Sequence, residues 1–322
     1  MSMKISEKTL TTEKTGGRLR RFPRKKKEPL APELRRERRR DTVRSMCFLG
    51  PSVIGVAVFF ILPFLVVVYY SVIRSTINPE FVFLDNFKAV LGNYAFQMAA
   101  KNTALFSVIA VPLAVVLSLV LALMLECRIP MKSWFRTFFL SPMMVPVASV
   151  VLIWQVVFHN NGMLNSMITS LGGTGADWLN SPYCMIVIVV LFLWKNLGYN
   201  MILFMAALNN IPNELLEVAD VEGAGPVHKF FNIKLRYLSP TVLFVTILSI
   251  INSFKIFREI HLLVGDHPYE GLYMLQHFMN NTFGNFDYQK MSAAAVILAM
   301  VMVVIIALLF LVEDVFGKDV EG

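Results

Sequence analysis

The segment Ile211–Pro240, IPNELLEVADVEGAGPVHKFFNIKLRYLSP, is a polar stretch between two long apolar runs. Pro212 fits the first turn of a helix, where the missing N–H is not needed. Residues 223–226, GAGP, then end that helix and begin another, because glycine adopts the left-handed cap and proline fits the next first turn. The segment therefore predicts two short amphipathic helices in a V, which would form a docking surface rather than a catalytic site.

Each of the two predicted helices has an apolar and a polar side. The apolar stripe of the first helix is Ile211, Leu215, Val218 and Ala219, and its acidic residues are Glu217, Asp220 and Glu222. The apolar side of the second helix is Val227, Phe230, Phe231, Leu235 and Leu238, and its polar side is His228, Lys229, Asn232 and Arg236. We expect the two helices to be held at the membrane surface.

The composition places the chain among membrane proteins. Of its 322 residues, 56% are hydrophobic and only 16% are charged, which is too apolar for a soluble domain. The formal net charge of +8 is unevenly distributed, since residues 1–46 hold sixteen of the thirty lysines and arginines. We expect residues 1–30 to be disordered and residues 32–44 to form a short helix on the lipid surface. A polybasic segment can bind nucleic acid, but this one adjoins an apolar run, which favours anionic lipid and no nucleic acid.

Six apolar runs are long enough to cross a membrane, which takes about 20 residues. The predicted spans are Cys47–Tyr70, Thr103–Leu125, Thr137–Phe158, Tyr183–Leu208, Ser239–Ile256 and Met291–Val312. Pro63 predicts a kink in the first span, and Pro142 and Pro146 interrupt the third, which a membrane tolerates only against protein or a cavity. The fold class is therefore all-α, an integral membrane protein with six transmembrane helices.

An even number of spans puts both termini on one side of the membrane. Basic residues mark the cytoplasmic side, and they occur in residues 1–46 and in the loop that carries Arg128, Lys132 and Arg136. The segment Ile211–Pro240 then also faces the cytoplasm, whereas residues 71–102, 159–182 and 257–290 face outward. We expect a multi-pass protein of the bacterial cell (inner) membrane with both termini in the cytoplasm.

Sequence patterns for enzymatic chemistry are absent. There is no Gly-x4-Gly-Lys-Ser/Thr phosphate loop, so ATP hydrolysis would need a separate chain. The three cysteines, Cys47, Cys127 and Cys184, have no metal-ligand spacing. We expect the chain not to be an enzyme and to bind no metal and no cofactor of its own.

Several polar side chains fall inside predicted spans, where an ionisable group costs roughly 2.5–3.5 kcal/mol or more. The predicted substrate-path residues are Lys195, Asn196, Asn200, Asn252 and Ser253. The alternative for each is hydrogen bonding between helices. A second group, Lys255, Arg258 and Glu259, follows the fifth span, and we expect it to form an outer gate or a contact for an extracellular partner. Nearby aromatic residues would suit a carbohydrate; they are Trp154, Trp194, Tyr199 and Phe254.

The segment Ile211–Pro240 resembles the EAA loop of permease subunits of ABC importers. The matching residues are Glu217, Ala219, Gly223, Ala224, Phe230 or Phe231, Ile233, Leu235 and Pro240. Val218, Glu222 and Arg236 depart from the pattern, and with Arg236 in place of the usual proline the second helix should run on unkinked towards Pro240. The resemblance implies contact with an ATPase through Glu217, Ala219, Asp220, Glu222, Gly223, Ala224 and Gly225.

The resemblance to carbohydrate-type permeases covers about residues 47–315. It includes the FLDNF motif (residues 83–87), Asn102-Thr103, Trp194-Lys195-x-x-Gly198 and residues 253–268, SFKIFREIHLLVGDHP, where Asp266 and His267 stand in place of the usual glycines. We therefore divide the chain into a basic segment (1–46), a permease domain (47–315, with the coupling loop at 209–240) and a short tail (316–322).

The resemblance implies an importer subunit that forms the path for a sugar or oligosaccharide. It also implies the partners: a second permease, two cytosolic ATPase subunits that bind ATP and Mg, an extracytoplasmic sugar-binding protein and membrane lipid. Two alternatives stay open, an ion-coupled secondary transporter and an ABC importer permease for a cargo other than carbohydrate. The sequence does not specify the sugar.

Overall fold

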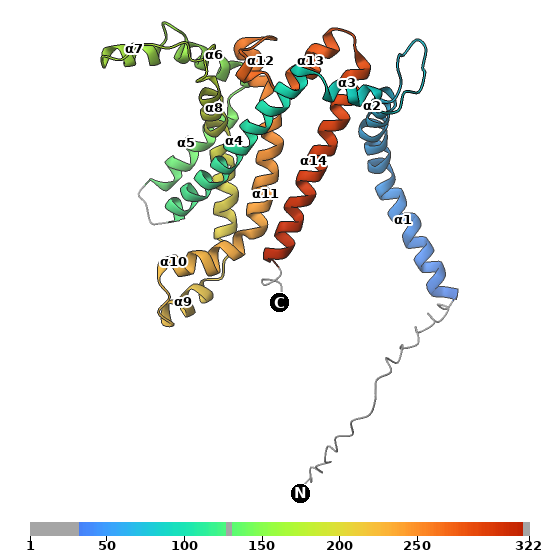
Figure 1. The fold of residues 1–322 in the computed structure, drawn as a ribbon. Coiled ribbons are helices and arrows are strands. Elements are labelled where there is room, and N and C mark those ends of the chain that lie inside the picture. The colour runs from blue at the N-terminus through green and yellow to red at the C-terminus, as the bar shows by residue number, and fades with distance from the viewer. Residues whose placement is uncertain (1–31, 127–130, 318–322) are drawn as a thin grey trace, which may run out of the picture. The chain divides into compact units, whose positions relative to one another are not determined.

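A computed structural model describes residues 32–126 and 131–317 (Figure 1), and within these ranges the regular elements are helices joined by loops. The only strand-like pairing among them is one isolated bridge between Ile73 and Phe81. The predicted all-α class is confirmed. The expectations for residues 1–31, for Arg128 and for residues 318–322 fall outside the described residues.

Six helices are long and apolar enough to cross a membrane, as predicted. They are Arg44–Ser71, Tyr94–Glu126, Val147–Ser170, Cys184–Leu208, Pro226–Val264 and Tyr288–Glu313. The second begins nine residues before the expected start at Thr103, and the fifth includes the end of the coupling loop, because both helices continue into polar sequence beyond the apolar run. The third differs more strongly from its prediction.

The chain divides into two compact units, residues 1–61 and 62–322, and we describe them separately. The described part of the first is α1 (Pro32–Val56), which contains Pro51, followed by the π-helical turn η1 (Ala57–Ile61). Pro63 lies just after this turn and has no N–H to donate to the carbonyl four residues earlier. A π-helical turn accommodates such a missing hydrogen bond. The irregularity that we predicted as a kink at Pro63 therefore falls within the preceding turn, η1.

The second unit is built on α4 (Tyr94–Glu126), α8 (Cys184–Leu208), α11 (Leu235–Phe254) and α14 (Tyr288–Gly317). α4 packs along α8, α11 contacts both, and α14 packs against α11 and α2 (Leu62–Ser71). Towards one end of this bundle, Phe106 and Phe192 meet edge to face with ring centroids 5.4 Å apart. Towards the other, Met201, Phe204 and Leu238 are fully buried. Large side chains thus fill the space between α4, α8 and α11 along their length.

The predicted third span, Thr137–Phe158, is not one helix. It consists of α5 (Lys132–Met144) and α6 (Val147–Phe158), separated by an extended Val145 and by Pro146, which precedes α6. A residue before proline is disfavoured in the helical region, which accounts for the break at Val145. A further helix, α7 (Met163–Ser170), follows within the predicted outward-facing loop 159–182.

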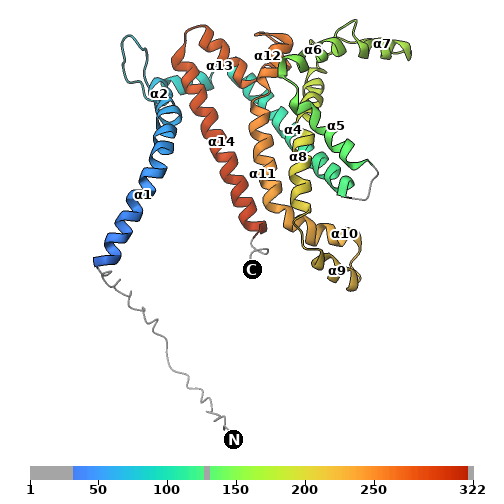
Figure 2. The same cartoon turned by 180° about the vertical axis from the view of Figure 1, so that it is seen from behind.

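The loops of the second unit lie at its two ends (Figures 1 and 2). One end carries α3 (Asp85–Leu91), α6, α7, α12 (Phe257–Val264), η3 (Glu270–Leu272) and α13 (Leu275–Gly284). The opposite end carries α9 (Asn213–Val221) and α10 (Pro226–Lys229). The three loops predicted to face outward therefore share one end, and the coupling loop lies at the other.

Asn102 and Thr103 fix the connection between η3 and α13. The Asn102 amide donates to the carbonyls of Glu270 (2.6 Å) and Tyr273 (3.1 Å), and the Thr103 hydroxyl accepts from the backbone N–H of Leu275 (3.0 Å). These bonds satisfy backbone groups that lie outside regular helix. The Asn102-Thr103 pair of the sequence motif thus has a structural role at this end of α4.

Gly198 allows α8 and α5 to approach at backbone distance. A Cβ atom built on Gly198 would lie 1.9 Å from the carbonyl oxygen of Phe139. No side chain can be accommodated at that separation, so the two helix backbones would have to move apart. This contact explains the glycine of the Trp194-Lys195-x-x-Gly198 motif through packing alone.

We predict that Gly198→Ala sharply reduces the yield of folded protein, with a cost at the upper end of the 1–3 kcal/mol typical of overpacking or more, because backbone rather than a flexible side chain blocks the methyl group. The yield of monodisperse protein in detergent and its thermal midpoint measure the effect. Gly284→Ala is the matched control, since an added Cβ there meets nothing within 4 Å. Equal behaviour of the two variants would contradict the close approach.

His277 of α13 is fully buried, and its Nδ1 accepts a hydrogen bond from the backbone N–H of Met274 (3.2 Å). Its Nε2 has no partner among the described residues. Burial lowers the pKa of His277 to about 4, and positive charge on His261 lowers it further while Asp266 opposes the change. The imidazole is therefore neutral at pH 7 and holds the start of α13.

We predict that stability falls as the pH is lowered from 6.5 towards 4, because the unfolded chain then binds a proton on His277 that the folded chain excludes. Between pH 6.5 and 5 the loss amounts to about 2 kcal/mol. Thermal unfolding of the solubilised protein across this range measures it. His277→Gln should show a flatter pH dependence, whereas His267→Gln, at an exposed position, should keep the wild-type slope. Identical slopes in all three proteins would refute the assignment.

Candidate functional site

The coupling loop folds as the predicted pair of helices, α9 and α10. Gly223 adopts φ +77°, and Ala224 N–H donates to the carbonyl of Ala219 (2.8 Å), so the first helix ends in a left-handed cap. Gly225 precedes α10, and Pro226 occupies its first turn. The glycine and proline positions of the sequence therefore have the conformations predicted for them.

The second helix of the loop continues into the membrane-spanning part without interruption at Arg236 or Pro240. α10 is followed by the π-helical turn η2 (Phe230–Lys234) and then by α11. The expected run through Arg236 to Pro240 is present, but the helix changes direction earlier, between α10 and α11 (Figure 1). The π-turn inserts an extra residue per turn and so marks where this change occurs.

The coupling loop is anchored to the bundle by apolar contacts and by an ion pair. Ile211 is buried in the cluster that contains Leu208 and Leu238, and Ala219 of α9 is also buried. Lys234 Nζ lies 2.7 Å from both carboxylate oxygens of Glu126, the last residue of α4. A second ion pair, between Lys229 and Asp220, joins α10 to α9. Movement of the loop is thereby tied to the Glu126 end of α4 and to α11.

The predicted apolar stripes are only partly buried. Leu215 and Val218 of α9 are 38% and 56% exposed, whereas Ile211 and Ala219 of the same stripe are buried. Val221 is 89% exposed, and in the second helix Val227 and Phe231 are 69% and 57% exposed. Apolar residues lie on two sides of these helices, and spacing alone does not tell which side meets the bundle. We name the exposed set the outer coupling face: Leu215, Val218, Val221, Val227 and Phe231.

Most of the predicted path residues form a chain of interhelical contacts, which we call the polar seam. It comprises Lys195, Asn196 and Asn200 of α8, Ser249, Asn252 and Ser253 of α11, and Glu259 of α12. Asn252 Nδ2 donates to Asn196 Oδ1 (2.9 Å), and Asn200 Nδ2 donates to Ser249 Oγ (3.0 Å). These pairs agree with the alternative left open for each amide, which was hydrogen bonding between helices. That the same amides also line a path stays a prediction.

The seam extends to α4 and to α12. Ser253 Oγ and Ser107 Oγ of α4 are 2.9 Å apart, and both Asn200 and Ser249 are almost fully buried. Lys195 Nζ forms an ion pair with Glu259, whose side chain is 6% exposed. The seam therefore links four helices through side chains that hydrocarbon could not solvate.

Glu259 does not form one group with Lys255 and Arg258. We expected the three to lie together at the outer interface, but Glu259 is buried against α8 whereas Lys255 and Arg258 are exposed. The helix is broken between Phe254 and Phe257, so the spacing of these residues does not follow a single helix. The pairing of Lys195 with Glu259 was not predicted, although both were singled out as unusual charges.

The aromatic residues expected near the path also separate. Trp154 of α6 stacks on Phe158, and its ring centroid is 6.0 Å from that of Trp194, next to Lys195. Phe254 lies elsewhere, in an apolar pocket of about 690 Å³ between α4, α11 and α14. Two of the four aromatic residues therefore lie together beside the polar seam, whereas Phe254 does not join them.

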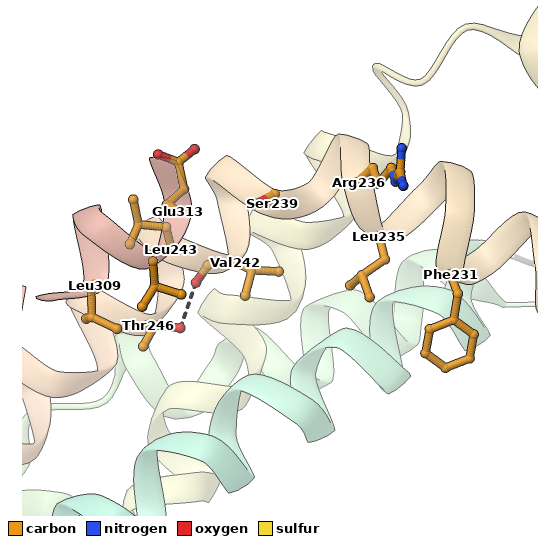
Figure 3. A pocket seen from close by; sticks show the side chains of 10 residues that line it. Phe231, Leu235, Arg236, Ser239, Val242, Leu243, Thr246, Leu309 and Glu313 are labelled. Atoms are coloured by element: carbon orange, nitrogen blue, oxygen red, sulfur yellow. Dashed lines mark hydrogen bonds between the residues drawn. The ribbon is translucent and has the colours of Figure 1, made fainter. Parts of the chain in front are cut away.

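A further pocket, of about 450 Å³, lies between the start of α11 and the end of α14 (Figure 3). Its walls are mainly apolar, with Leu235 and Val242 on one helix and Leu309 on the other. Arg236 and Glu313 lie at opposite ends of it. The Thr246 hydroxyl donates a hydrogen bond to the carbonyl of Val242 (2.7 Å). The unusual Arg236 is thus exposed beside the coupling loop.

Comparison with known proteins gives consistent matches. A family described as "Binding-protein-dependent transport system inner membrane component" matches residues 114–322. The sn-glycerol-3-phosphate transport system permease protein of Rhizobium meliloti (strain 1021) is 30% identical over 270 residues, covering 81% of this chain and 92% of that protein. The arabinooligosaccharides transport system permease protein of Bacillus subtilis (strain 168) is 30% identical over 67% of this chain and 70% of its own length.

Among solved structures, a chain of a bacterial alginate ABC transporter in complex with an alginate pentasaccharide-bound periplasmic protein superposes with a TM-score of 0.76. The match covers 89% of this chain and 99% of that one at 20% sequence identity. At this identity the likeness concerns the fold, which is shared over nearly the whole length of both chains.

We predict that Lys195→Met destabilises the protein by about 3 kcal/mol, because it leaves the Glu259 carboxylate buried without its cation. Glu259→Gln should cost less, since Lys195 is 27% exposed and an amide still accepts a hydrogen bond. The double variant should recover most of the loss. Thermal midpoints of the four proteins in detergent provide the double-mutant cycle. Additive losses would show that the two side chains do not interact.

Proposed function

Because the chain belongs to the family of binding-protein-dependent transport system inner membrane components, we propose that it is one of two permease subunits that form the path for a sugar or oligosaccharide. A multi-pass inner-membrane protein of this family is the membrane component of an ABC transporter and not its catalytic subunit. In our proposal, residues 211–240 contact the ATPase subunits, which bind ATP and Mg. An extracytoplasmic sugar-binding protein delivers the cargo at the opposite end.

The observation that carries the coupling role is that the outer coupling face is exposed while the residues behind it are fixed to the helix bundle. Val221 and Val227 expose most of their side chains to the surroundings, and such apolar exposure marks an interaction site. Behind this face, Ile211 is buried in the bundle core, Ala219 is buried, and Lys234 is held by Glu126. A partner that moves this surface would move α4 and α11 with it, as a rigid-body transition requires.

The carbohydrate assignment is supported by the relatives. Several with high similarity have names that specify sn-glycerol-3-phosphate, arabinooligosaccharides or sulfoquinovosyl glycerol. Amide side chains and indole rings near each other, such as Asn196, Asn252 and Trp194, are groups that bind sugar hydroxyls and ring faces. Family membership decides against an ion-coupled secondary transporter. A cargo other than carbohydrate is the remaining alternative.

For the orientation, we take the coupling loop to lie in the cytoplasm, so that the end of the second unit that carries α12 and α13 faces outward. An even number of spans and the basic segments predicted from the sequence then put both termini in the cytoplasm. Alternating access would then expose the polar seam to one side at a time, because ATP binding shifts the equilibrium between two arrangements of the helices. The basic segment 1–46 would lie at the cytoplasmic surface next to anionic lipid.

The test of function is ATP-driven uptake. Cells lacking the gene are compared with complemented cells for uptake of a panel of radiolabelled mono- and oligosaccharides, and the complex is then purified through a tag on this chain and reconstituted into liposomes. We expect co-purification of ATPase subunits and accumulation of one sugar class only when ATP and the binding protein are present. Uptake without ATP, or ATP-driven uptake of non-carbohydrate cargo only, would overturn the proposal.

We predict that Val221→Asp reduces the amount of ATPase that co-purifies by about tenfold or more, because a charge replaces an exposed apolar contact at an interface centre. Folding should be unaffected, since the side chain is 89% exposed. Quantitative blotting of the purified complex measures the effect. Ile77→Asp is the matched control, at 94% exposure on a loop of the opposite end. Normal ATPase recovery with Val221→Asp would exclude this face from the interface.

A further inference from the structure

A cationic pocket lies between α12, α13 and α14, at the end of the second unit that we propose faces outward. It has a volume of about 690 Å³ and is lined by Lys255, Phe257, Arg258, His261, Leu262, Gln276, Met279, Asn280, Phe283, Met291 and Ala295. No carboxylate is among these lining residues. We propose that this pocket binds the anionic group of the cargo, a carboxylate, phosphate or sulfate on a sugar, and that the transporter therefore takes acidic saccharides. The inference rests on the proposed function.

The charges of the pocket have no partner within the described chain. Among the described residues, neither Lys255 nor Arg258 forms an ion pair, and both side chains are exposed. Glu259, the carboxylate closest to them in sequence, is buried against Lys195 on the other side of α12. Two cations facing one cavity repel each other, so an anion between them lowers the energy of the site.

Asp266 contacts two residues that line the pocket, and it is already engaged. One carboxylate oxygen lies 3.4 Å from His261 Nδ1 and accepts from the Asn280 amide at 3.4 Å. Its backbone carbonyl accepts from Asn281 (3.2 Å). Asp266 therefore links α12 to α13 at the edge of the pocket, through His261 and Asn280. It does not pair with Lys255 or Arg258, whose charges stay without a partner among the described residues.

The remaining lining residues suit a sugar acid. Gln276 and Asn280 supply amide donors for an oxyanion or for hydroxyl groups. Phe257, Met279 and Phe283 supply apolar surface for the ring of a sugar. The volume lies within the 300–1,000 Å³ range of small-molecule sites. A lone surface charge would offer neither an apolar surface nor amides.

The pocket and the polar seam are close along the chain but do not share lining residues. Lys255 directly follows α11, three residues after Asn252, whereas no seam residue lines the pocket. Two cations together with the Gln276 and Asn280 amides suit the anionic group and the hydroxyls of a sugar acid, and a lipid headgroup is an outcome of the test.

The test uses the complex purified through a tag on this chain, in nanodiscs of phosphatidylcholine. The probes are glucuronate and glucose 6-phosphate, with glucose as the neutral counterpart and sulfate as the bare anion, and the readout is the shift in thermal midpoint with probe concentration. We expect the anionic probes to stabilise the complex and glucose not to. The double variant K255Q/R258Q should need at least about tenfold more of either sugar acid, since two charge-assisted bonds are lost.

Matched variants separate the pocket from general charge effects. R74Q/K88Q removes two cations from the loop at the same end without touching the pocket, and it should titrate as the wild type does. Arg258→Lys should retain most of the binding because the charge remains. The effect of the sugar acids should also weaken with rising ionic strength.

Several outcomes would overturn the inference: equal shifts with glucose and glucuronate, no shift with any probe, or a K255Q/R258Q titration identical to the wild type. A response only to added phosphatidylglycerol would assign the pocket to lipid. Loss of binding-protein capture in K255Q/R258Q with unchanged sugar-acid titration would assign it to that protein. Because these measurements do not need transport, a failure of ATP-driven uptake would count against the proposed function and leave the anion site standing.

Discussion

In hydrocarbon no water satisfies an amide or a charge, and the polar seam is where this chain meets that constraint. Asn200 bonds to Ser249, Asn252 bonds to Asn196, and Lys195 pairs with Glu259. Each pair joins α8 to α11 or α12, so the polar groups fix which helices are neighbours. An unpaired buried polar group costs on the order of 1–3 kcal/mol, which makes alternative packings of these helices unfavourable. The other helices of the second unit pack around this pairing.

Close packing completes the same interface. Gly198 brings the backbone of α5 against α8, while Phe106 and Phe192 fill the space towards α4. The break at Val145-Pro146 lets α6 leave the line of α5 and bring Gln155 to the carbonyl of Leu263 in α12 (3.2 Å). Pro142 is buried, but Met144 and Pro146 are exposed, so this chain by itself covers only one side of the break.

The two ends of α11 carry different side chains, and this difference distinguishes the two ends of the second unit. At one end the helix continues through a π-turn into α10, with Lys234 bound to Glu126 and apolar side chains exposed beyond it. At the other end it stops at Phe254 and is followed by Lys255 and by α12, which carries Arg258 outward and Glu259 inward. The outer coupling face and the cationic pocket lie near opposite ends of one helix. This arrangement suits the proposed function, in which ATPase subunits act at one end and cargo is delivered at the other.

The sequence alone determined the number and approximate limits of the spans, because apolar length is a local property, and it determined the turn at Gly223-Ala224-Gly225-Pro226, because these residues restrict their own backbone. It also marked Lys195, Asn252 and Glu259 as residues in need of a partner. Only the tertiary structure decided the partners. Helical spacing specifies the side of a helix but not which neighbour lies there, so it did not tell that Leu215 and Val218 of the apolar stripe are exposed while Ile211 and Ala219 are buried. Lys255, Arg258 and Glu259, adjacent in sequence, were separated because the helix breaks after Phe254 and Glu259 lies within reach of a lysine sixty-four residues away.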